Sequence, residues 1–186
     1  KNASILSVGP AGENLSNIAT ILAENDFSGS AGLGAVMGSK KLKAIAVKGN
    51  RKLVPGNEDQ FNEIVKHFLH LKNYPITLPK GISHSLVGPK LKKDYCFGCV
   101  IGCNRATYEA EDGKKGKFMC QAASFYDSWA SKYYGKVTET PFYAVKLCDD
   151  YGVCTKSLMM LIIWLTACFK AGILTEKDTG IPLSKV

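Results

Sequence analysis

The sequence predicts an α+β fold, with an α/β portion followed by a mostly α-helical portion. Three observations support this prediction. A strand-turn-helix pattern opens the chain, a glycine-rich stretch and a second strand follow, and apolar residues recur at helical spacing from residue 59 onward. Arg51–Asn57 contains Pro55 and Gly56, which favour a connecting segment, so we expect domains over residues 1–52 and 53–186.

The first portion is predicted to start with an interior strand at Ser4–Val8. Gly9–Gly12 forms a turn, and an amphipathic helix is expected from Glu13, with Leu15, Ile18, Ala19 and Leu22 on one face. Lys43–Lys48 then predicts the strand that closes this portion. Because the chain opens directly on a strand without an initiator Met, we expect it to be an internal part of a longer protein.

A stretch with four glycines in ten residues, Gly29–Gly38, is the most unusual part of the first portion. Glycine lets the backbone approach a ligand closely, and free amides in such a loop favour phosphate or another anion. A tight turn that packs a helix on a sheet explains the same glycines equally well. The match to a dinucleotide fingerprint is weak, because no strand directly precedes it and Arg51 and Lys52 stand where an acidic residue is required.

The second portion is predicted to be mostly helical. Apolar residues at helical spacing mark helices over Asp59–Lys72, the middle of Phe118–Tyr134, Phe142–Tyr151 and Leu158–Phe169. Gly152 and Gly172 are expected to end the last two. The final apolar run is too short to span a bilayer, so we expect a buried core helix. Tyr74–Lys93 is expected to be irregular loop, and His67 and His70 to be solvated or core-edge side chains.

Cys96, Cys99 and Cys103 form a C-x2-C-x3-C run in which three thiols can converge on one metal centre. Gly98 and Gly102 permit the tight turn that such a ligand loop needs. A fourth ligand must come from elsewhere in the protein. The alternative is that the three cysteines are buried side chains or form disulfides. Clustered intracellular cysteines serve this purpose less often than they serve metal binding or redox chemistry.

Composition narrows the setting of the protein. Seven cysteines without a regular disulfide framework or a signal peptide favour a reducing, cytoplasmic compartment. The net charge of +8 lies in lysine runs that are not interleaved with aromatic residues, so a nucleic-acid partner is not expected. Recruitment of an acidic redox protein is a better use of this charge.

Several motifs, in this order and spacing, resemble the aldehyde ferredoxin oxidoreductase family. They are Gly9–Leu15, Gly32–Val47, the cysteine run, Leu147–Gly152 and Ala171–Thr175. The resemblance covers nearly the whole chain and implies the end of a pterin-binding N-terminal domain followed by the start of a helical domain.

The resemblance also implies an activity and its cofactors. It implies a tungsten or molybdenum bis-pterin centre beside a [4Fe-4S] cluster, passing electrons from an aldehyde or related small-molecule substrate to ferredoxin or a similar acidic redox protein. It implies no membrane partner, and a homodimer or larger complex is an open option. Cys96, Cys99 and Cys103 would hold the cluster, whose fourth ligand lies outside this chain. The implied cofactor-binding residues are Gly29, Ser30, Ala31, Gly32, Leu33, Gly34, Asp149 and Cys154.

The chain departs from the family pattern at three places. In the glycine segment, Ser30 stands where family members carry an arginine that grips phosphate, and Ala31 stands where they carry a glycine. Cys154 stands where members carry a pterin-binding aspartate, and it is either a small apolar filler or a thiol close to the metal. Tyr143 and Lys146 occupy the positions of a Glu-x-x-His metal site, so no metal is expected there.

Two alternatives to an aldehyde oxidoreductase stay open. An aromatic acyl-CoA reductase-like subunit of the same family would keep the cofactors and change the substrate. A non-catalytic iron-sulfur or zinc-binding module would keep only the cysteine site.

Overall fold

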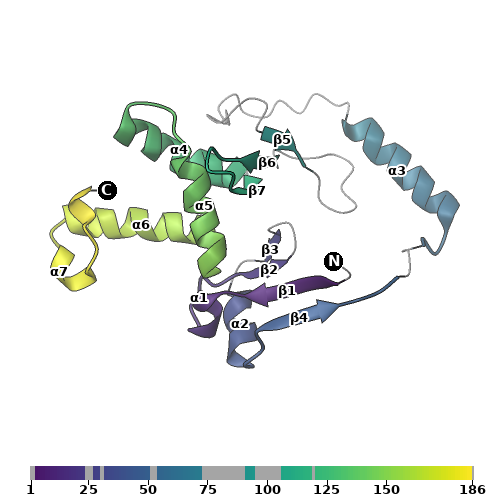
Figure 1. Ribbon diagram of the computed structural model, residues 1–186, viewed down its shortest axis with the longest axis horizontal. Coiled ribbons are helices and arrows are strands. Elements are labelled where there is room, and N and C mark those ends of the chain that lie inside the picture. The colour runs from purple at the N-terminus through teal and green to yellow at the C-terminus, as the bar shows by residue number, and fades with distance from the viewer. Residues whose placement is uncertain are drawn as a thin grey trace. The chain divides into compact units, whose positions relative to one another are not determined.

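A computed structural model describes residues 3–23, 27–29, 32–50, 54–72, 91–94, 106–118 and 120–185. The fold is α+β, as predicted, and Figure 1 shows the order of its helices and strands. The chain divides into two compact units. The hairpin unit comprises Lys1–Leu6, Ala23–Asp26 and Ile45–Lys146, and the glycine unit comprises Ser7–Leu22, Phe27–Ala44 and Leu147–Val186. The expected domain boundary at residue 52 stays a prediction.

Four short strands form the first sheet, in the order β3-β2-β1-β4. They are β1 (Ser4–Val8), β2 (Ile21–Ala23), β3 (Phe27–Gly29) and β4 (Ala44–Val47). The predicted strands over residues 4–8 and 43–48 are therefore confirmed. Within the glycine unit, the Val8 amide donates to the Lys43 carbonyl at 3.1 Å, just before β4 begins.

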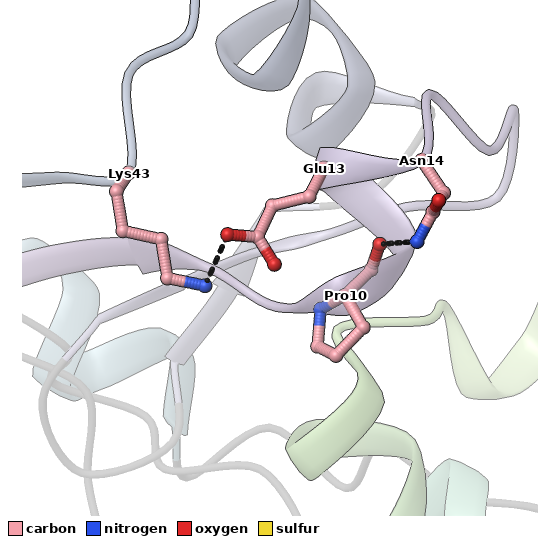
Figure 2. Close-up of polar contacts among 4 residues, drawn as sticks. All are labelled: Pro10, Glu13, Asn14 and Lys43. Carbon is pink, nitrogen blue, oxygen red and sulfur yellow. Dashed lines mark hydrogen bonds and ion pairs between the residues drawn. The ribbon is translucent and has the colours of Figure 1, made fainter.

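The helix expected from Glu13 to Leu22 is wrong. Helix α1 spans only Pro10–Glu13, and Leu15 lies in the left-handed region at φ 57°. A residue in the left-handed conformation does not fit into a right-handed helix, so the helix ends before Leu15. The Asn14 side chain and the Asn14 amide both donate to the Pro10 carbonyl, at 2.9 and 3.0 Å, which holds Asn14 as the C-cap of this short helix (Figure 2). The following residues leave the helical path and lead into β2.

The hairpin unit contains α3 (Glu58–Lys72) and a three-stranded antiparallel sheet, β5-β6-β7. Its strands are β5 (Leu91–Lys93), β6 (Ala106–Glu109) and β7 (Lys115–Phe118). A turn at Asp112-Gly113 joins β6 to β7, and Gly113 takes a positive φ of 83°. The small sheet was not predicted, because its sequence is polar and alternates weakly. Strand β5 also corrects the end of the irregular loop expected over Tyr74–Lys93, the rest of which lies outside the described residues.

Aromatic packing joins this sheet to the start of α5 (Thr140–Tyr151). Phe118 and Phe142 are fully buried, and the Tyr108 ring lies edge-on to Phe142 with centroids 5.1 Å apart. The Tyr108 hydroxyl donates to Glu139 Oε1 at 2.5 Å, and the Glu111 amide donates to both oxygens of the same carboxylate at 3.2 Å. Burial and the Glu139 carboxylate raise the pKa of Tyr108 to about 12.

The remaining helices are α2 (Leu33–Ser39), α4 (Cys120–Tyr134), α6 (Thr155–Lys170) and α7 (Glu176–Thr179). A 3-10 turn, η2, follows at Leu183–Lys185. The predicted helices near residues 59–72, 118–134, 142–151 and 158–169 are confirmed. The expected burial of α6 is not, because Met160, Ile163 and Trp164 are exposed within this chain. Among the described residues, no helix has both the length and the apolar character needed to cross a bilayer.

We predict that Tyr108→Phe destabilises the hairpin unit by about 1–2 kcal/mol, because the Glu139 carboxylate loses a charge-assisted donor. Since folding raises the pKa of this tyrosine from 10.0 to about 12, the stabilisation is complete below pH 10 and is lost as the pH rises through about 12. Denaturation midpoints measured across this alkaline range should decline less steeply for the variant. An identical decline would show that the bond contributes nothing.

Candidate functional site

The candidate site is built on a contact between two segments that are far apart in the sequence. The Thr20 amide donates to the Gly152 carbonyl and the Cys154 amide donates to the Ile18 carbonyl, both at 2.7 Å. Ala19 and Val153 thereby form an antiparallel β-bridge. We call the two segments, Ile18–Thr20 and Gly152–Cys154, the glycine joint. Both belong to the glycine unit.

Gly152 lets the chain turn out of α5 and lie close to the start of α1. It lies at φ 68° directly after α5, with its amide bonded to the Asp149 carbonyl at 3.0 Å. The Val153 amide bonds to the Cys148 carbonyl at 2.9 Å, which completes a Schellman motif. A Cβ on Gly152 would stand 2.9 Å from the Gly9 nitrogen, and a Cβ on Gly9 would stand 2.8 Å from the Gly152 nitrogen. The end of α5 therefore meets the start of α1 backbone to backbone.

The glycine-rich stretch reaches the same joint from its other side. The Gly34 amide in α2 donates to the Ala19 carbonyl at 3.3 Å, and a Cβ on Gly34 would overlap the Thr20 carbonyl oxygen. A Cβ on Gly38 would overlap the Gly12 carbonyl oxygen in α1. Gly34 and Gly38 therefore allow close packing of α2, which is the packing explanation for part of this stretch.

The centre of the joint is buried. Ala19 is fully buried, and Thr20 is only 3% exposed. The Thr20 hydroxyl has no hydrogen-bond partner among the residues the structure describes. Cys154 is half-buried on the other segment, and Asp149 is half-buried near the end of α5. Cys154 occupies the N-cap of α6, and its thiol makes no capping hydrogen bond.

The structure brings several of the expected cofactor-binding residues into one unit. Gly32, at φ 77°, precedes α2, while Leu33 and Gly34 form its first turn. Gly34 and Cys154 bond to adjacent residues of the joint, and Gly29 ends β3. Ser30 and Ala31 lie outside the described residues.

Cys96, Cys99 and Cys103 also lie outside the described residues, so the expected cluster site stays a prediction. Among the residues described, no group of three or more His, Cys, Asp or Glu side chains is arranged to hold a metal ion. His67 and His70 are exposed on α3. Cys148 is buried in α5, and Cys168 is a half-buried thiol in α6.

Tyr143 and Lys146, which stand at the two positions of the family's Glu-x-x-His metal motif, make other contacts. Loss of hydration and a hydrogen bond to Asp112 raise the pKa of Tyr143 to about 12. Lys146 is buried, and its ammonium lies 6.0 Å from the centroid of the Phe142 ring. A buried cation near an aromatic face suits packing of α5.

Sequence reasoning missed two residues of the site, Gly9 and Thr20. Gly9 was assigned only to a turn, and Thr20 was hidden inside the wrongly predicted helix. Neither has a local signal for its role, because the role arises from contact with a distant segment.

These observations define an α+β protein in which a glycine-rich segment and the end of a helix meet at one buried joint. Two family sequence profiles match this chain. "Aldehyde ferredoxin oxidoreductase, N-terminal domain" matches residues 1–49, and "Aldehyde ferredoxin oxidoreductase, domains 2 & 3" matches residues 66–185. The chain belongs to the aldehyde ferredoxin oxidoreductase family, as the resemblance of its motifs predicted.

Individual relatives agree with this assignment. The tungsten-containing aldehyde ferredoxin oxidoreductase of Pyrococcus abyssi is 26% identical over 97% of this chain and 35% of its own length. The enzyme of the same description from Pyrococcus furiosus is 41% identical over 54% of this chain and 23% of its own length. The chain thus spans about a third or less of the relatives it matches.

A solved structure shares the fold. It is described as the active site complex BamBC of benzoyl coenzyme A reductase in complex with 1,5-dienoyl-CoA. It superposes with a TM-score of 0.69 at 18% identity, covering 95% of this chain and 33% of the other.

We predict that Gly152→Ala lowers the free energy of unfolding by about 3 kcal/mol, because a Cβ would combine left-handed strain with a clash against Gly9. Gly172→Ala is the matched control. Gly172 ends α6 in the same conformation, at φ 71°, and a Cβ added there would meet nothing within 4 Å, so about 1 kcal/mol is expected. Equal losses in denaturant titrations would mean that the approach of Gly9 is not restrictive.

We predict that Cys154→Asp stabilises the chain by about 1 kcal/mol. The carboxylate would accept from backbone amides in the first turn of α6 and interact favourably with the helix dipole. A rise in the thermal midpoint checks this. No rise would indicate that the thiol makes a compensating interaction.

Proposed function

We propose that this chain is part of a tungsten- or molybdenum-pterin oxidoreductase that couples oxidation of an aldehyde, or a related substrate, to reduction of ferredoxin through a [4Fe-4S] cluster. One structural observation carries the proposal. Two motifs resemble the family's pterin-binding segments, one around Gly34 and one around Cys154. Their backbone amides bond to adjacent residues of the segment Ile18–Thr20. This contact brings the two motifs close enough together to contribute to one binding site.

The residues at the joint fit a phosphate-bearing pterin in part. The Gly34 amide is committed to the Ala19 carbonyl, so Gly34 contributes packing. Gly29, Ser30, Ala31, Gly32 and Leu33 are the segment proposed to offer backbone amides to the phosphate. Asp149, near the end of α5, supplies a carboxylate, and Cys154 supplies a thiol from the segment Gly152–Cys154.

Each part of the chain then has a separate task. Backbone amides before α2 bind and orient the anionic group. The interlocked glycines hold α1, α2 and the end of α5 in fixed register, which limits movement of the binding segment. When bound, the metal-pterin supplies the two-electron redox chemistry. The thiolates of Cys96, Cys99 and Cys103 are the soft ligands that an iron-sulfur cluster requires.

A second candidate function keeps this arrangement and changes the substrate. The fold shared with a subunit of benzoyl coenzyme A reductase favours an aromatic acyl-CoA reductase-like role. Full-length protein purified without oxygen separates the two candidates. Benzaldehyde with oxidised benzyl viologen tests the first, and 1,5-dienoyl-CoA with the same acceptor tests the second.

We predict that Cys96→Ser, Cys99→Ser and Cys103→Ser each remove most of the iron from the full-length protein, because a missing thiolate leaves an open corner on the cluster. Iron analysis and electron paramagnetic resonance of the reduced protein measure the loss. Cys168→Ser is the control, since this half-buried thiol lies in α6, away from the cysteine run in sequence. Iron content that is unchanged in all four variants would refute the cluster. Zinc in place of iron would favour the non-catalytic module.

A further inference from the structure

The turn that ends α2 carries a cluster of exposed lysines. Lys40, Lys41 and Lys43 are all exposed, and Lys43 forms an ion pair with Glu13 at 3.0 Å (Figure 2). Neither Lys40 nor Lys41 has an ion-pair partner among the described residues. We call Lys40–Lys43 the basic turn. Its charge is therefore only partly compensated inside the protein.

The backbone at Lys41 is unfavourable for a lysine. The Lys41 amide bonds to the Gly38 carbonyl at 2.8 Å and the Leu42 amide to the Met37 carbonyl at 3.2 Å, which forms a Schellman motif with Lys41 at φ 54°. The corresponding residues after α5 and α6 are Gly152 and Gly172. Glycine or asparagine adopts this conformation at lower cost than lysine. The lysine therefore costs stability that another residue would avoid.

Apolar side chains surround the basic turn. Leu33 and Val36 are 46% and 56% exposed on α2, and Leu42 is 39% exposed within the turn itself. A surface of aliphatic side chains beside positive charges is complementary to a partner protein whose own surface has an apolar centre with carboxylates around it. Residues 33–43 contain no arginine and no aromatic ring, which are the side chains that grip phosphate bidentately and stack on bases.

We propose that the basic turn and the neighbouring face of α2 form a docking surface for a small acidic electron-carrying protein. That the partner carries electrons rests on the proposed function, whereas the acidic character of the partner rests on the surface itself. Helix α2 has seven residues, so the basic turn lies about 10 Å from the segment proposed to bind the cofactor. A carrier docked on the turn would thus sit about one helix length from that segment.

The test measures association of full-length protein with a small acidic [4Fe-4S] ferredoxin as the probe. At about 50 mM salt, we expect Lys41→Asn to slow association about threefold and Lys40→Gln with Lys41→Asn to slow it about tenfold. The differences should vanish at about 0.5 M salt, where surface charges are screened. Lys177→Gln removes an exposed charge elsewhere in the same unit and should have no effect.

Thermal stability gives a second, independent readout. Because asparagine relieves the strain at position 41, Lys41→Asn should raise the melting temperature by about 1–3 °C while weakening association. Unchanged association of the Lys41→Asn variant, whatever its melting temperature, would show that this lysine only ends the helix and would overturn the proposal. Charge-dependent binding to single-stranded DNA or to phosphatidylserine vesicles, without binding to ferredoxin, would also overturn it.

The proposed function and the docking surface can fail separately. Tungsten and molybdenum analysis and viologen-linked turnover test the cofactor chemistry without any protein carrier. Association with immobilised ferredoxin needs no turnover. Protein without metal that still binds ferredoxin through the basic turn would refute the function and keep the surface. Active protein whose lysine variants associate normally would do the reverse.

Discussion

The pair of backbone hydrogen bonds between Ile18–Thr20 and Gly152–Cys154 is the constraint on which the rest of the glycine unit depends. Each bond is only a modest net contribution to stability, but together they fix two segments that are far apart in the sequence. Beside this contact, the absence of a Cβ at Gly9 and Gly152 lets the end of α5 approach the start of α1. The joint is bonded to the first turn of α2 and to the N-cap of α6, and both places carry residues proposed to bind the cofactor.

Local signals predicted the parts of the fold that local forces determine. Apolar spacing identified α3 and α6, and a glycine after each of α5 and α6 marked the helix ends correctly. The sequence could not reveal that Leu15 adopts a left-handed conformation, so α1 was predicted too long. Polar residues concealed the β6–β7 hairpin, which depends on burial of Phe118 against Phe142.

The candidate site also has parts that the sequence predicted and parts that it could not predict. Motif resemblance proposed Gly29–Gly34, Asp149 and Cys154 as candidates, yet the bonds from Gly34 to Ala19 and from Cys154 to Ile18 are long-range contacts that no periodicity encodes. The structure also separates roles that the sequence merged. Gly34 is occupied with packing, whereas Gly32 supplies the left-handed residue that turns the chain into α2. Glycine content alone cannot distinguish close packing from ligand approach.

The glycine joint also has a consequence for how the chain acquires its structure. Its two halves are separated by most of the sequence, so the loop between them must close before α1 and α2 gain their packing partner. Contacts of such long range form slowly. During synthesis the first sheet, α1 and α2 would emerge from the ribosome well before the end of α5, and would lack their contact with it until then. Early folding of this region is therefore a stage at which a chaperone would have the most to protect.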